Sequence, residues 1–138
     1  MKKLLGINRA AILAGLLCSV LFGGVAFASE VAVVKVRFEL RGDSWNVNTT
    51  LRHADTGWSH YADAWRIVDK KGNVIGKRIL YHPHVDEQPF TRSLGNVQIP
   101  KGVTVVFVEA HDKESGWSKQ RVRVDLSKSK GERFEVRR

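Results

Sequence analysis

After residue 30 the chain alternates hydrophobic and polar residues with a period of two, which is the pattern of β-strands that bury one face. Hydrophobic side chains alternate with charged ones over residues 34–41, and an alternation of the same period returns over residues 45–52. Gly42 and Asp43 separate the two segments and form a turn signal. The pattern therefore predicts a β-hairpin at the start of the domain.

Five further segments predict strands, because each is extended in pattern and bounded by residues that favour turns or loops. They are residues 62–69, 74–81, 90–99, 103–111 and 122–126. The run 103–111 is the most apolar, so it should be a central strand. No helical pattern follows residue 28. Seven short strands predict an all-β fold: a single antiparallel β-sandwich of the immunoglobulin or fibronectin type III kind, with Trp65 in its core.

The first residues have the features of an export signal. Lys2, Lys3 and Arg9 accompany an apolar run over residues 10–25, and Ala26-Phe27-Ala28 provides the small-x-small motif after which signal peptidase cleaves. We expect the mature protein to be periplasmic or secreted, with no stable insertion in a membrane. The chain is thus predicted to comprise a cleaved signal peptide (1–28), the sandwich domain (29–126) and a basic, flexible tail (127–138).

Two other fates of the apolar run are open. It is nearly long enough to stay in the bilayer as an uncleaved anchor. It also contains Cys18, which would be lipidated in a lipoprotein, although Leu17 is not the small residue that such processing favours before the cysteine. Cys18 is the only cysteine, so cleavage after Ala28 leaves a domain without a disulfide. The fold must then be held by its core or by a metal ion.

The positive charge of the chain is moderate after export. Loss of Lys2, Lys3 and Arg9 lowers the formal net charge from +9 to +6. The remaining excess is spread along the chain and thickens in the tail, whose cations belong to a solvated surface or contact an anionic lipid or polymer. An exported protein of this charge is not expected to bind nucleic acid.

Histidines and acids crowd the stretch between the fourth and fifth predicted strands. Residues 81–90 contain His82, His84, Asp86 and Glu87, where a simple turn would use Gly, Asn or Ser. Because consecutive strands alternate in direction, the second, fourth and sixth strands should end at one pole of the sandwich. That pole then gathers all five histidines and many acids: His53, His60, His82, His84, His111, Asp55, Asp63, Asp86, Glu87 and Asp112.

Two interpretations of this histidine pole are open. His82 and His84 point the same way in an extended backbone, so they could begin a Zn(II) or Cu(II) site. The other candidate ligands are His53, His60, His111, Asp86 and Glu87. The alternative is that these residues, with Asp55, Asp63 and Gln88, only satisfy backbone groups of the loops. The spacing of these residues along the sequence matches no diagnostic metal-binding motif.

Trp58 and Trp117 lie in loops at the same pole. Each either plugs its loop, which we favour, or stacks on a bound sugar or peptide. Catalytic motifs are missing from the sequence: it has no Gly-x-Ser-x-Gly, no phosphate loop and no cysteine nucleophile in the mature domain. We therefore expect a monomeric, non-catalytic binding protein whose partner is a metal ion or an envelope component. A structural or adhesive envelope module is the alternative.

Two motifs carry a family resemblance. His53-Ala54-Asp55-x-Gly57-Trp58-x-His60-Tyr61-Ala62-Asp63-x-Trp65 and the stretch from His82 to Arg92 resemble the signature of a family of small exported bacterial proteins. Ala110-His111-Asp112 and Gly116 match as well. The resemblance covers residues 33–126 and implies a single immunoglobulin-like β-sandwich behind a signal or lipoprotein peptide. It implies no catalytic residue.

Overall fold

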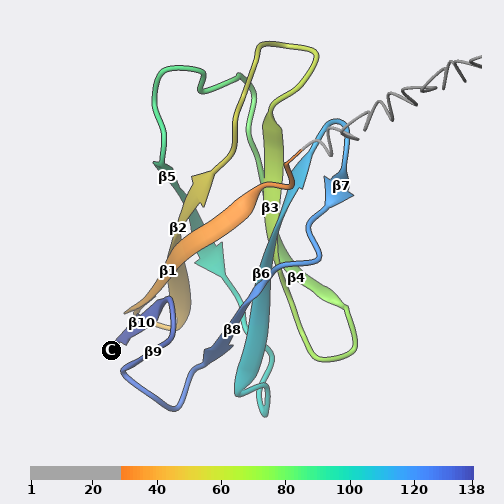
Figure 1. Ribbon diagram of the computed structural model, residues 1–138. Coiled ribbons are helices and arrows are strands. Elements are labelled where there is room, and N and C mark those ends of the chain that lie inside the picture. The colour runs from red at the N-terminus through yellow and green to blue at the C-terminus, as the bar shows by residue number, and fades with distance from the viewer. Residues whose placement is uncertain (1–28) are drawn as a thin grey trace, which may run out of the picture.

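The computed structural model describes residues 29–138, all of them in strands, turns and loops that build two sheets (Figure 1). The first sheet has the order β5 (Phe90–Val97), β2 (Ser44–Arg52), β1 (Ala32–Arg41), β10 (Phe134–Arg137) and β9 (Lys130–Gly131). The second has the order β4 (Val74–Ile79), β3 (Ala62–Val68), β6 (Val105–Asp112) and β7 (Gly116–Trp117), and β8 (Val122–Asp125) also pairs with β6. In the described part of the chain, no helix is long and apolar enough to cross a membrane.

A single hydrophobic core lies between the sheets. Phe38 and Leu51 of the first sheet and Trp65 and Val108 of the second belong to it, and all four side chains are fully buried. The predicted core position of Trp65 is therefore confirmed. The all-β, two-sheet architecture is confirmed as well, while the immunoglobulin or fibronectin type stays a prediction.

The structure has ten strands, not the seven predicted, and it is not wholly antiparallel. The segment expected to be a flexible tail, residues 127–138, contains β9 and β10. β10 pairs in parallel with β1, with Phe134 opposite Val36 and Val136 opposite Phe38. Phe134 and Val136 are buried in the core cluster, so hydrophobic burial orders this segment. The predicted signal peptide, including Cys18, falls outside the described residues.

The loops that follow β2, β4 and β6 lie at the same end of the molecule, as the strand alternation predicts (Figure 1). They carry four of the histidines, and the fifth, His111, is the last residue but one of β6. The histidine pole is therefore a real assembly of three loops, and its interior can be described atom by atom.

A candidate metal centre

His53 follows the last residue of β2 and is turned into the protein. Its side chain is fully buried, and its Nδ1 lies 2.6 Å from Asp55 Oδ1. A carboxylate can only accept a hydrogen bond, so Nδ1–H donates, and in the neutral ring the lone pair is on Nε2. That Nε2 is buried and has no hydrogen-bond partner among residues 29–138. His53 therefore presents a free acceptor atom to the interior of the pole.

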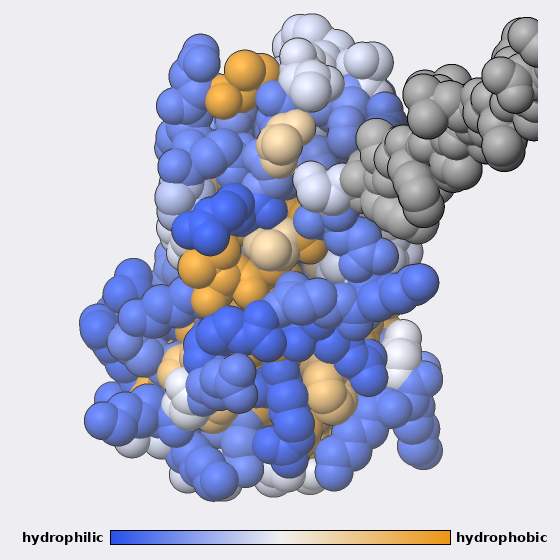
Figure 2. All heavy atoms as spheres, in the orientation of Figure 1, coloured by the Kyte–Doolittle hydropathy of each residue, from blue (hydrophilic) through white to orange (hydrophobic). Residues whose placement is uncertain are grey.

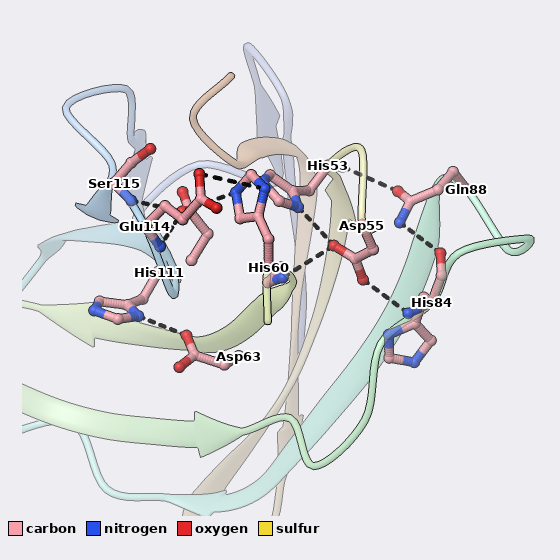
Figure 3. A network of polar contacts seen from close by, with 11 residues as sticks. His53, Asp55, His60, Asp63, His84, Gln88, His111, Glu114 and Ser115 are labelled. Atoms are coloured by element: carbon pink, nitrogen blue, oxygen red, sulfur yellow. Dashed lines mark hydrogen bonds and ion pairs between the residues drawn. The ribbon is translucent and has the colours of Figure 1, made fainter. Parts of the chain in front are cut away.

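His60 faces His53 from the other end of the same loop (Figure 3). The loop closes on itself: His60 N–H donates to the Gly57 carbonyl, and the His60 carbonyl accepts from Thr56 N–H. Gly57 has a φ of 150°, a conformation open to glycine and strained for other residues. This closure brings the two imidazole rings to 4.7 Å between centroids at an interplanar angle of 82°.

Asp112, the last residue of β6, brings a carboxylate to the two rings. Its Oδ1 accepts the N–H groups of Glu114 and Ser115, which closes the turn that leads into β7. Gly116, with a φ of 78°, completes that turn. The side chain is fully buried, and its other oxygen, Oδ2, has no partner in the described chain. Asp112 therefore holds the loop with one oxygen and leaves the other free.

The three side chains form a group that could hold a metal ion. One ligand atom from each of His53, His60 and Asp112 lies within 4.8 Å of the others. His60 Nε2 is 3.4 Å from Asp112 Oδ1, yet the two atoms are not hydrogen-bonded. Two atoms that bind one tetrahedral zinc ion at about 2.0–2.1 Å are roughly 3.3 Å apart. The Asp112 carboxylate thus lies close enough to His60 Nε2 for both side chains to bind one ion, although the oxygen of this pair is the one that also accepts the two turn N–H groups.

The charge of the group suits a cation. Burial alone would raise the pKa of Asp112, but the N–H groups of Ser115 and Glu114, together with His53 and His60, outweigh it and hold the pKa below its ordinary value. The carboxylate is therefore ionised at neutral pH. Glu114 adds a second acid at the rim, where its Oε2 lies 3.6 Å from His60 Nδ1.

Asp55 and Gln88 fix the loops around the group. Asp55 Oδ1 accepts from Ala62 N–H as well as from His53, and its Oδ2 accepts from His84 N–H at 2.7 Å. Gln88 accepts from His53 N–H and donates to the His84 carbonyl. A carboxylate on the far nitrogen of an imidazole is the usual support of a histidine that binds metal. Asp55 was absent from the predicted ligands, and its role here is to orient His53.

His82 and His84, the pair favoured by local sequence, are not in this group. Their rings do lie side by side, 4.6 Å apart. His84 Nε2, however, accepts a hydrogen bond from Arg92 at 2.7 Å, and the ring stacks on Phe90. A guanidinium at the acceptor nitrogen opposes a second cation there. His82 is exposed, with its Nδ1 3.2 Å from the Pro83 carbonyl.

The other predicted site residues also lie apart from the group. His111 Nδ1 is 2.5 Å from Asp63 Oδ1, on the outer face of the second sheet. Asp86 is exposed, and Glu87 lies 3.4 Å from Arg92. Trp58 is 66% exposed, so the prediction that it plugs its loop is wrong. Trp117 is half-buried, with the Arg66 guanidinium 3.8 Å above its ring.

Comparison with known proteins gives one informative relative. The chain is 37% identical over 97 residues to a protein of Halomicrobium mukohataei named "Putative lipoprotein". The match covers 70% of this chain and 47% of that protein, so the chain matches about half of its relative's length. This similarity supports kinship with a bacterial or archaeal protein family. No known family and no solved structure matches the chain.

Proposed function

We propose that this protein is an exported envelope protein that binds a divalent transition-metal ion, Zn(II) or Cu(II), through His53, His60 and Asp112. The observation that carries the proposal is the set of free atoms in the group. His53 Nε2, His60 Nε2 and Asp112 Oδ2 are buried and have no hydrogen-bond partner among the described residues. Buried polar atoms without partners cost free energy, and one cation would satisfy all three.

The donor set selects the class of ion. Two imidazole nitrogens and one carboxylate oxygen suit zinc and copper, whereas Mg(II) prefers oxygen ligands and keeps its waters. Three protein ligands leave a fourth position that a water molecule can take. Glu114 lies against the other ring nitrogen of His60, Nδ1, where it can orient that ring. His53 is already oriented for binding by Asp55, so little further ordering of that ring is needed.

Support for the envelope location comes from the relative that is named a lipoprotein and from the predicted export signal. The proposed role is binding, and the mature domain has no Gly-x-Ser-x-Gly motif, no phosphate loop and no cysteine nucleophile. The competing role, a structural module, is favoured by one specific observation: Asp55 and Gln88 join the β2–β3 loop to the β4–β5 loop without any ion.

The experiment is a thermal denaturation series on protein purified without a histidine tag and stripped with a chelator. Zn(II) or Cu(II) at a hundredfold excess over its dissociation constant stabilises the folded state by about 2.7 kcal/mol. For a domain of this size that free energy raises Tm by about 10 °C or more. Mg(II) should leave Tm unchanged.

Matched variants separate the group from the rest of the pole. His53→Gln, His60→Gln and Asp112→Asn should each lose most of the Zn(II)-dependent rise. Asn at 112 keeps an oxygen for the two turn N–H groups, so its effect reports the lost ligand. His82→Gln and His111→Gln remove the same ring from the same pole and should retain the rise. If Zn(II) does not raise the Tm of the wild type, or if the control variants lose the rise equally, the proposed metal site is wrong and the residues only brace the loops.

A further inference from the structure

A second feature of the molecule is a basic cleft between β8 and the β9–β10 hairpin. The cleft has a volume of about 360 Å³. Five cationic side chains line it, against two carboxylates. The cations are Arg121, Arg123, Lys128, Lys130 and Arg133, and the acids are Asp125 and Glu132. The segment that builds most of this basic cleft is the one that the sequence predicted to be a flexible tail.

The cations of the basic cleft are not neutralised by the protein. None of the five has a carboxylate oxygen within 4.0 Å among the ion pairs of residues 29–138, although six other cations of the chain do. Asp125 is occupied within its own turn, because Oδ1 accepts both the N–H and the hydroxyl of Ser127. Arg133 Nη1 donates to the Val33 carbonyl and Arg121 lies over the Phe107 ring, and neither contact neutralises the charge. Like charges without ion-pair partners that line one concave surface create a positive potential that attracts anions.

The hairpin that forms one wall of the basic cleft is held in a defined conformation. Arg133 has a φ of 60°, which is uncommon for a residue with a side chain and carries strain. Its carbonyl accepts Val36 N–H at 2.9 Å, so the strained residue is fastened to β1. Gly131 packs so closely on the Phe134 ring that an added Cβ would collide with it. The basic cleft is therefore a built surface and not a loose basic tail.

Its lining indicates the chemistry of the ligand. Guanidinium groups recognise phosphate oxygens through paired hydrogen bonds, and lysines add point charges. The large hydrophobic side chains that are exposed on this protein are Trp58, Val74, Ile79, Tyr81 and Val85, none of which lines the cleft. Membrane-surface binding normally inserts apolar side chains, and binding of single-stranded nucleic acid normally stacks bases on aromatic rings. The one aromatic ring that lines the basic cleft, Phe134, is buried in the core, so the cleft offers neither an exposed apolar side chain nor an exposed aromatic ring.

We propose that the basic cleft binds a linear, phosphate-bearing polymer that has no bases. The surface over β8, β9 and β10 is predominantly hydrophilic, as such a ligand requires (Figure 2). This end of the molecule lies opposite the loops of the metal group (Figure 1), so the two sites are separate. An envelope protein with this arrangement attaches to an anionic polymer by one end and presents its metal site at the other.

Inorganic polyphosphate is the probe for the test, with binding followed by fluorescence anisotropy on the intact protein. The triple variant Arg123→Gln, Lys128→Gln, Lys130→Gln removes three lining cations that make no hydrogen bond through their side chains in the described structure. The control variant Lys70→Gln, Lys71→Gln, Lys101→Gln removes the same charge from exposed loops outside the cleft. Both variants should keep the wild-type circular dichroism spectrum.

The wild type and the control should bind polyphosphate with similar affinity, and the cleft variant should bind about tenfold or more weakly at low salt. The slope of log affinity against log salt should also fall in the cleft variant by up to about one for each cation that contacts a phosphate. Equal weakening in both variants would show that binding depends only on the net charge of the protein, which would overturn the proposal. Tighter binding to single-stranded DNA or to anionic vesicles than to polyphosphate would overturn it as well.

Discussion

Asp55 is the residue whose loss should most disturb the histidine pole. Its buried carboxylate accepts three hydrogen bonds, at 2.6 Å from His53 Nδ1, 3.0 Å from Ala62 N and 2.7 Å from His84 N. Asp55→Ala leaves three buried donors without an acceptor, and each such donor costs about 1–3 kcal/mol. The free energy of unfolding should therefore fall by about 3–9 kcal/mol, which is a large part of the 5–15 kcal/mol typical of a domain.

Urea denaturation at pH 7 in the presence of a chelator measures this loss without a contribution from metal. Asp63→Ala is the matched control, because Asp63 accepts from the single imidazole of His111 and a quarter of its side chain is exposed. Loss of this partly exposed pair in Asp63→Ala should lower the free energy of unfolding by about 1 kcal/mol or less. A loss below about 1 kcal/mol in Asp55→Ala would show that the three donors find other partners and would refute the bracing network.

Three further variants test the support of the metal group, the C-terminal segment and the titration of His84. Asp55→Asn removes the charge behind His53 and should weaken Zn(II) affinity by about 10- to 100-fold, as measured by calorimetric titration. Phe134→Ala should lower the free energy of unfolding by about 3–5 kcal/mol, because Phe134 is buried in the core. An unchanged free energy of unfolding would mean that residues 127–138 do not pack on the domain. Burial lowers the pKa of His84, and the charges of Arg92 and His82 lower it further. The contribution of neutral His84 to the free energy of unfolding is therefore complete above about pH 6.5 and is lost as the pH falls. The decrease in Tm below about pH 6.5 should be shallower in His84→Gln than in the wild type.

The sequence predicts the strands of this fold well where a strand buries one face. The hairpin of β1 and β2 and the central position of Trp65 follow from the period of two. The face of β1 is less regular than predicted, because a register shift between Val33 and Lys35 puts Val33 in the core in place of Val34. Phe134 and Val136 were two hydrophobic residues in a charged segment, and only the presence of a free β1 edge gives them a strand to pair with.

The alternation of strand direction also predicts that the histidines gather at one pole, but not which of them meet. Local sequence favours His82 and His84, yet Arg92 from the next strand takes the acceptor nitrogen of His84. His53 and His60 meet because their loop closes at Gly57, and Asp112 reaches them because the β6–β7 turn fixes its carboxylate. These contacts depend on tertiary structure, so residue spacing alone carries no signal for them.

The most direct measurement of the central claim is anomalous diffraction at the zinc edge from crystals of the Zn(II)-loaded protein. The proposed function predicts one strong peak about 2.0–2.1 Å from His53 Nε2, His60 Nε2 and a carboxylate oxygen of Asp112, with Asp55 still bonded to His53 Nδ1. A peak located instead at His82 or His111, or no peak within bonding distance of His53 and His60, would contradict it.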